Sequence, residues 1–385
     1  MQFLLIASFS LLLFRVYAAG TAYAAARAAA RDAVDLLAKQ GIKEYESFQP
    51  LPNNNCTVEN AVRRQEWSDL PLKTRRSYVS AVKCLIAAPR SKAFENAPGI
   101  VSRYDEFVYV HANMAFTTHY TIYIWAYEQA LRNECGYIGY SPYWNWGRYS
   151  SDPIKHPIFD GSDASLSGNG GFYNHTGTKM ISAPAPYDIL PPAGGGGCLL
   201  NGPFKDTVIN LGPFQPGLSG ITPNNQSDGL GYNPRCLRRD INPIAAAVTA
   251  TNYTMLQINK FANDINGFQI AMFDYAEDRS WGIHAGGHYT FGGDPASDTL
   301  QSPNDPVFWP HHTMLDRVWW IWQTRNLTYG LQAIGGTRTF NNTPPSPLAT
   351  LDDEVGLLHL GAPVILRDLL NTVGGKGGDF CYVYV

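Results

Sequence analysis

The stretch Pro310–Arg325, with the sequence PHHTMLDRVWWIWQTR, carries two adjacent histidines at the start of a strongly helical pattern. Pro310 suits the first turn of a helix, because the N–H group that proline lacks would have no partner there. Successive side chains on a helix point about 100° apart, so His311 and His312 face different neighbours. This segment predicts a helix that presents one imidazole to a site shared with facing helices.

Other stretches also have the apolar spacing of helices. They are Thr21–Gln40, Pro71–Ala88, Ile100–Arg132 and Tyr253–His284. Gly41 follows the first of them, and we expect it to end that helix. Residues 136–240 are rich in Gly, Pro, Asn and Ser, which predicts long loops, and the β-branched end Cys381–Val385 predicts a short strand.

The fold class that these patterns predict is mainly α. We expect a four-helix bundle surrounded by long loops with minor β. The bundle would use the regions near 101–132, 255–284 and 310–325 and one N-terminal helix. A chain of 385 residues, 45% hydrophobic and 13% aromatic, can bury one large core, which predicts a single catalytic domain over residues 19–385. A net charge of -3 without any run of Lys or Arg argues against a nucleic-acid partner.

The N-terminus has the features of a signal peptide over residues 1–18. An apolar run from Phe3 to Phe14 precedes Val16-Tyr17-Ala18, a small-x-small cleavage pattern, and is shorter than the roughly 20 residues of a bilayer span. We therefore expect a secreted protein with no stable membrane anchor. Six cysteines, which allow three disulfides in 15 pairings, and six glycosylation sequons fit that route. The sequons are at Asn55, Asn174, Asn225, Asn252, Asn326 and Asn341.

Histidines carry the strongest functional signal. Six of the nine fall into two groups, which are His111 and His119, then His284, His288, His311 and His312. His284 and His288 are four residues apart, so a helix places both imidazoles on one face, ready to share a metal. The H-E-x-x-H pattern of zinc proteases is absent, which disfavours a zinc hydrolase. Ala285, Gly286 and Gly287 would leave room for a substrate, and the glycines predict that the pair lies in the last turn of its helix.

The run from Asp305 to Trp320, preceded by Ser302-Pro303-Asn304, resembles the copper-B signature of the fungal tyrosinases and catechol oxidases, which are type 3 copper proteins. The resemblance implies that His312 joins His284 and His288 as a copper ligand. His311 and Asp316 would lie behind the ligands, with Asp316 orienting an imidazole. Further segments resemble the copper-A half of short fungal members. They are Arg103–His111, Glu128–Arg132, Cys135–Tyr137, Pro142–Trp146, Phe159–Gly161 and Gly168–Gly170.

The copper-A half departs from the family pattern, because the expected third histidine in a Trp-His-Arg run is missing. His111 and His119 are either the first and second ligands or the second and third. His156 or His175 would otherwise have to be recruited from loops, where ligands are poorly preorganised. A coding segment lost in gene prediction, a natural variant with a weakened site, and an inactive chain all explain the gap, and we favour the first.

The resemblance implies two copper ions that use O2 to oxidise phenols or o-diphenols to o-quinones. The partners would be a small phenolic substrate or a tyrosyl-containing peptide, and O2, in pigment or secondary-metabolite formation. Members that hydroxylate monophenols often carry Asn where this chain has Ala285, which favours diphenol oxidation; Glu277 could supply a carboxylate. The contrasting hypothesis is a non-catalytic or single-copper relative.

Overall fold

The computed structural model describes residues 32–48, 55–114, 120–180, 188–273, 281–339 and 342–385. This part of the chain is helix-rich, as the sequence predicts. Its longer helices are α2 (Ala33–Ser47), α3 (Leu72–Ala87), α4 (Arg103–Met114), α5 (Tyr120–Asn133), α7 (Thr251–Lys260), α8 (Ile265–Phe273), α9 (Ile283–Phe291) and α11 (Phe308–Thr324). The shorter helices are α6 (Pro243–Ala247), α10 (Gly293–Ala296) and α12 (Leu327–Gly330). None of the described helices is long and apolar enough to cross a membrane.

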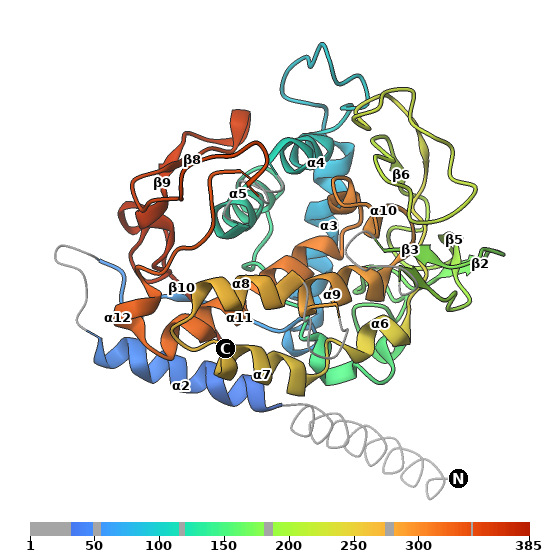
Figure 1. Cartoon of the computed structure of the whole chain (residues 1–385). Coiled ribbons are helices and arrows are strands. Elements are labelled where there is room, and N and C mark those ends of the chain that lie inside the picture. The colour runs from blue at the N-terminus through green and yellow to red at the C-terminus, as the bar shows by residue number, and fades with distance from the viewer. Residues whose placement is uncertain (1–31, 49–54, 115–119, 181–187, 274–280, 340–341) are drawn as a thin grey trace, which may run out of the picture.

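Helix α11 is the central element of the fold. It packs against α2, α5, α7 and α9, and all its residues except Trp319 are buried. Figure 1 shows it crossing the middle of the molecule, with α2 and α7 along its lower side. Pro310 lies in its first turn, where no intrahelical partner is lost. The helix predicted from residues 310–325 is therefore present, and its histidines are buried inside the protein.

Three predicted helix boundaries are wrong. Gly41 does not end a helix, because α2 continues through it to Ser47. A Cβ at Gly41 would lie 2.6 Å from Oγ1 of Thr324, so glycine is used there to bring α2 close to α11. The stretch 100–132 contains two helices, α4 and α5, and the stretch 253–284 contains α7, α8 and the start of α9.

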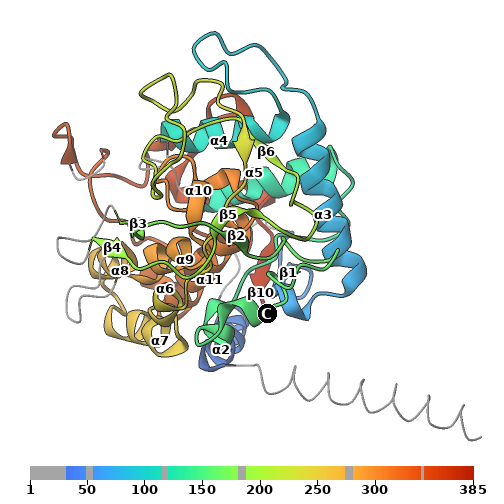
Figure 2. The ribbon, with the colours of Figure 1, turned by 90° about the vertical axis from the view of Figure 1, so that its right-hand side faces the viewer.

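The predicted loop region contains little regular structure. Its described part forms three short antiparallel pairs on one side of the molecule (Figure 2). The paired strands are β2 (Gly170–Phe172) with β5 (Gly196–Leu199), β3 (Thr178–Lys179) with β4 (Ile189–Leu190), and β6 (Val208–Ile209) with β7 (Arg235–Cys236). A further pair, β8 (Glu354–Val355) with β9 (Val364–Ile365), follows α12. Long loops with minor β are therefore confirmed.

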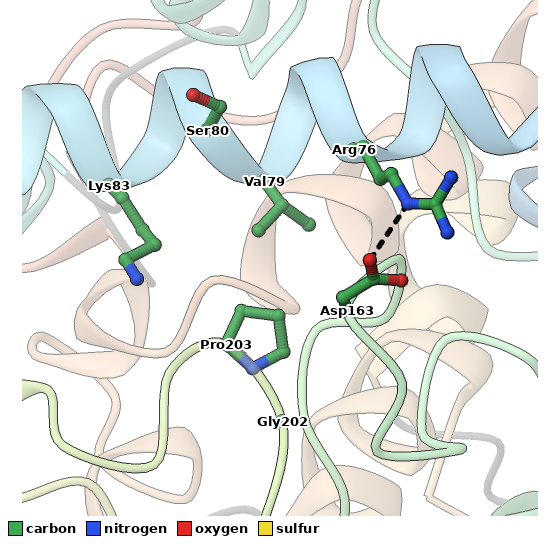
Figure 3. Close-up of a pocket in the computed structure, with 7 residues that line it drawn as sticks. All are labelled: Arg76, Val79, Ser80, Lys83, Asp163, Gly202 and Pro203. Carbon is green, nitrogen blue, oxygen red and sulfur yellow. Dashed lines mark hydrogen bonds and ion pairs between the residues drawn. The ribbon is translucent and has the colours of Figure 1, made fainter.

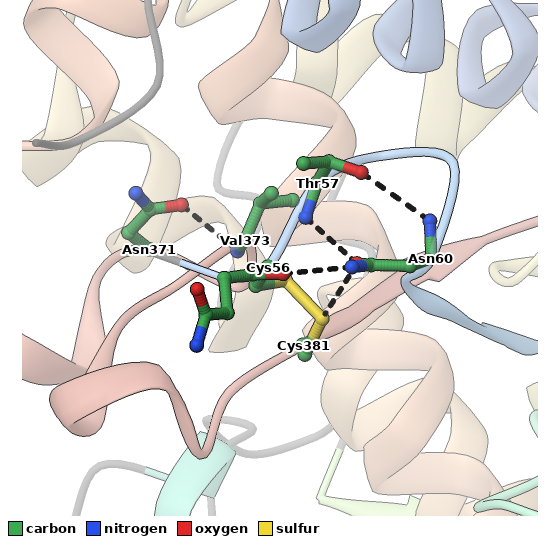
Figure 4. Close-up of a disulfide and its surroundings, with 7 residues drawn as sticks. Cys56, Thr57, Asn60, Asn371, Val373 and Cys381 are labelled. Atoms are coloured by element: carbon green, nitrogen blue, oxygen red, sulfur yellow. Dashed lines mark hydrogen bonds between the residues drawn. A yellow bond between two sulfur atoms is a disulfide. The ribbon is translucent and has the colours of Figure 1, made fainter. Parts of the chain in front are cut away.

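The C-terminal segment is joined to the segment between α2 and α3, beside α11. The predicted C-terminal strand is present as β10 (Tyr382–Tyr384), which pairs in parallel with β1 (Val62–Arg64). The Cys56–Cys381 disulfide fixes this pair, as Figure 4 shows. Cys84–Cys135 joins the segments that contain α3 and the end of α5, and Cys198–Cys236 joins β5 to β7. Three disulfides agree with the oxidising route that the cysteine count indicates.

Candidate metal centre

Three imidazoles from two helices converge on one point. Helix α9 presents His284 and His288 on one face, with 3.2 Å between their Nε2 atoms. Helix α11 adds His312, whose Nε2 lies 3.1 Å from Nε2 of His288. Imidazole nitrogens held tetrahedrally at ~2.0 Å from a shared metal ion are ~3.3 Å from one another. The observed spacing therefore fits a single metal ion between the three rings.

His311 belongs to the same cluster. One ligand atom from each of His284, His288, His311 and His312 lies within 4.8 Å of the others. The His311 ring stacks on that of His284, with centroids 5.7 Å apart and planes at 12°. The sequence predicts His311 behind the ligands; the structure places its ring directly beside them.

Unpaired nitrogens mark this cluster as a binding site. Neither ring nitrogen of His311 has a hydrogen-bond partner, and Nδ1 of His312 has none, although all three atoms are buried. A buried polar atom without a partner costs roughly 1–3 kcal/mol, so a ligand that supplies a partner stabilises the site. Burial lowers the pKa of His284 to about 3 and the pKa of the other three imidazoles well below the usual value. At neutral pH the four rings are uncharged, which is the form that binds metal.

The residues around His284 and His288 have other roles than the sequence predicts. The pair spans α9, with His284 in its first turn and only His288 in its last turn, where both were predicted. Gly287 leaves room for His311 and not for a substrate, because a Cβ there would overlap the His311 ring. Ala285 packs in a small apolar cluster with Tyr289, so it also does not face an open approach.

Aromatic side chains surround the four histidines. Phe308 lies against His312 with ring centroids 4.0 Å apart, and Phe273, which is 45% exposed, meets His284 edge-on at 4.5 Å. Trp146 lies behind His311, with centroids 5.2 Å apart. Of these three rings, Phe308 and Trp146 are buried and Phe273 is exposed to solvent.

The expected copper-A histidine lies in a different environment. His111, on α4, donates from Nδ1 to the carbonyl of Leu300 at 2.9 Å. Its Nε2 lies 3.0 Å from the hydroxyl of Tyr120, the first residue of α5. Both ring nitrogens are therefore occupied by protein groups. Within the described ranges, the α9–α11 cluster is the one group of three or more His, Cys, Asp or Glu side chains placed to hold a metal.

Other predicted residues are not at the cluster or fall outside the described ranges. His119, Glu277 and Asn341 lie in segments that the structure does not describe. Asp316 does not orient an imidazole as predicted: its carboxylate accepts hydrogen bonds from Thr121 and Tyr382, among others, and pairs with Arg64. The remaining five sequon asparagines are exposed, at Asn55, Asn174, Asn225, Asn252 and Asn326.

The two loop histidines have protein partners of their own. His156 accepts from the N–H of Ile158 at Nδ1 and lies 2.9 Å from Glu66 through Nε2. His175 accepts from the N–H of Gly177 and has Asp240 3.3 Å from its Nε2. The structure therefore gives no support to recruiting either of them to copper A.

Two surface cavities lie apart from the histidines. One, of about 570 Å³, is lined by α3 and by two loops, and the exposed Arg76 of α3 pairs there with Asp163 of one loop (Figure 3). The other, of about 500 Å³, lies beside Trp319. No predicted ligand lines either cavity, so neither defines the chemistry of the cluster.

Tyr120 and Leu300 are the groups that sequence reasoning missed. Tyr120 follows His119 directly, which was a signal, but that stretch contains many aromatic residues with the same helical spacing. The Leu300 carbonyl is a backbone group of a distant segment, so side-chain patterns could not reveal it.

The fold and the cluster together define a helix-rich protein with a group of four imidazoles that could hold a metal ion. Residues 75–325 match the common central domain of tyrosinase, which is well over half of the chain. The chain belongs to the tyrosinase family.

Curated relatives and a solved structure agree with this assignment. The chain is 38% identical to the tyrosinase-like protein OrsC of Emericella nidulans, over 79% of this chain and 85% of the relative. It is 36% identical to tyrosinase P of Aspergillus terreus, over 83% and 91%. A mutant polyphenol oxidase from Thermothelomyces thermophila has the same fold, with a TM-score of 0.82 and 34% identity over 91% of this chain and 97% of that structure.

Proposed function

We propose that this protein is a secreted copper oxidase that converts o-diphenols to o-quinones with O2. The observation that carries the proposal is that Nε2 of His288 lies 3.2 Å from Nε2 of His284 and 3.1 Å from Nε2 of His312, beside unpaired buried nitrogens. Imidazole suits copper, which binds nitrogen sites more tightly than the other divalent first-row metals. Copper, when bound, supplies the redox chemistry that couples oxidation of two o-diphenols to reduction of one O2 to two waters.

The chain's own residues would hold and shield this centre. In the proposal, His284 and His288 from α9 and His312 from α11 bind copper. His311 packs against His284 and limits its rotation. The metal would then lie inside a bundle in which α4 and α5 face α9 and α11. An aromatic substrate would approach past Phe273, whose exposed ring can stack on a phenol.

The names of relatives indicate only a general class of substrate. One relative, 34% identical over 86% of this chain, is named N-acetyl-6-hydroxytryptophan oxidase, from Emericella nidulans. That name describes an aromatic ring with a hydroxyl group. We propose a phenolic substrate of the same general kind, in pigment or secondary-metabolite formation, with a tyrosyl peptide as a further candidate.

Copper content and oxygen uptake test the proposal together. The protein would be secreted from this coding sequence, dialysed against a weak chelator and assayed for copper and for O2 uptake with 4-methylcatechol. We expect bound copper and one O2 consumed for every two catechols oxidised, with neither in a His288→Ala variant. Zinc in place of copper, or copper without catechol oxidation, would contradict the oxidase.

A second candidate is a non-catalytic or single-copper member of the family. It is favoured by His111, whose two ring nitrogens are both hydrogen-bonded to other groups. Sequencing the transcript across codons 105–130 separates the explanations for the short copper-A half. An added segment with a histidine supports a gene-prediction error, and an unchanged sequence supports a true variant.

We also propose that residues 1–18 are a signal peptide, that residues 19–385 form one domain, and that the exposed sequons carry glycan. N-terminal sequencing of the secreted protein, and its mass before and after enzymatic deglycosylation, test the first and last of these. A mature N-terminus at Met1 would contradict the signal peptide.

A further inference from the structure

Tyr120 lies between the two groups of histidines. Its hydroxyl contacts Nε2 of His111 at 3.0 Å. Its ring stacks on His312, with centroids 4.3 Å apart and planes at 20°. One phenol therefore touches both the isolated histidine of α4 and a proposed copper ligand of α11.

The direction of the hydrogen bond follows from the other side of the His111 ring. The Leu300 carbonyl can only accept, so Nδ1 of His111 carries the proton. A neutral imidazole with a proton on Nδ1 has a bare lone pair on Nε2, and Tyr120 must donate to it. The lone pair that a metal would need is already bound to a proton donor.

The second copper position that the family implies therefore does not fit the described residues. The first position has three imidazole nitrogens directed at one point, whereas His111 has both nitrogens satisfied and a ring standing between it and His312.

We propose that Tyr120 is an internal plug on the second metal position, which a second copper ion must displace. The hydroxyl caps His111 and the ring covers His312, so among the residues that the structure describes only the α9–α11 cluster is free to hold copper in this conformation. This inference rests on the proposed function only in assuming copper at that cluster.

Removal of the hydroxyl is the sharpest test, because it frees Nε2 of His111 and keeps the ring. Purified protein, Tyr120→Phe and Tyr123→Phe would each be titrated with Cu(II) in a chelator buffer. Tryptophan fluorescence quenching and the copper-to-protein ratio after dialysis would be measured. Tyr123 is the matched control, because it lies one turn along α5 and its hydroxyl donates to the Phe107 carbonyl at 2.7 Å.

We expect one tightly held copper in the wild type and in Tyr123→Phe. Tyr120→Phe should bind a second copper at least tenfold more tightly than the wild type does, and adding His111→Ala should remove that gain. A wild type with two equally tight coppers, or a Tyr120→Phe variant with no gain, would overturn the plug and leave the copper centre intact. A wild type that binds no copper would overturn the copper centre and the plug together.

A measurement without metal covers the case in which Tyr120→Phe does not fold. In copper-free wild type labelled with ¹⁵N-histidine, His111 should show a protonated Nδ1 and an unprotonated, hydrogen-bonded Nε2. The opposite tautomer would contradict the plug, because Nε2 would then be the donor.

Discussion

His311 and His312 of α11 and His111 of α4 are all buried but differ in what surrounds their nitrogens. In the cluster, His311 has no hydrogen-bond partner and His312 has an unpaired Nδ1. His111 has a backbone carbonyl on one side and a phenol on the other. Burial alone therefore does not identify a metal ligand. The convergence of Nε2 atoms from three rings does, because imidazole nitrogens at that spacing can share one metal ion.

Removing one imidazole from the α9–α11 cluster and, separately, His111 from α4 is the strongest test of this comparison. His288 contacts both His284 and His312, so His288→Ala should weaken copper binding at least ~100-fold and abolish catechol oxidation. His111→Ala should leave the first copper in place. Dialysed copper content measures both variants.

His359→Ala is the control for general effects of losing a histidine, because His359 pairs with Glu106 outside the cluster. It should keep the wild-type copper content. Equal copper loss in His111→Ala and His288→Ala would show that the two halves form one interdependent site, and the contrast between them would then fail.

The four-residue spacing of His284 and His288 is a local signal, and it places both rings on one face of α9. His312 was assigned through the resemblance to the copper-B signature, because the packing of α9 against α11 that brings it to the pair is a tertiary contact. The position of His284 was misjudged, since glycine at 286 and 287 indicates a helix end by propensity alone. The real cause is tertiary: a side chain at Gly287 would collide with His311.

The copper-A half was harder to predict because its partners come from distant segments. Leu300 contributes a carbonyl from 189 residues beyond His111, and no side-chain pattern encodes that contact. Asp316 has the spacing of a group that orients His312, yet its carboxylate serves Arg64 and the tyrosines of β10. Gly41 was misjudged for the same reason, since its role depends on Thr324 of another helix.

Acid should weaken the support behind the cluster. Glu66 is fully buried and pairs with Arg148 at 3.1 Å, in the segment that places Trp146 against His311. Burial alone would raise the pKa of this carboxyl, but His156, Arg148 and Ser68 outweigh it and lower the pKa from 4.5 to about 2. A lowered pKa means that the stabilisation is complete above pH ~4.5 and is lost as the pH falls toward 2.

The interactions of this buried carboxylate should contribute on the order of 3 kcal/mol to the unfolding free energy at neutral pH. Urea unfolding of the copper-free protein at pH 6.5, 4.5 and 3 would measure it. Glu66→Gln should be less stable than the wild type at pH 6.5, and the difference should shrink at pH 3. If the difference is the same at all three pH values, ionisation of Glu66 does not support this side of the cluster.

A single methyl group beside His311 gives a smaller and more local test. Gly→Ala inside a helix normally stabilises by up to ~1 kcal/mol. Gly287→Ala should do the reverse, because its Cβ would overlap the His311 ring and overpacking costs about 1–3 kcal/mol. The net loss should be about 1–2 kcal/mol, with roughly tenfold weaker copper binding as His311 shifts toward His284, and no change at His111.

Gly361→Ala is the matched control, since its Cβ position is open and its φ of 176° is ordinary extended backbone. Thermal unfolding and copper titration of both variants measure these effects. An unchanged copper affinity in Gly287→Ala would mean that His311 only fills space. The metal centre would then depend on three imidazoles and not on four.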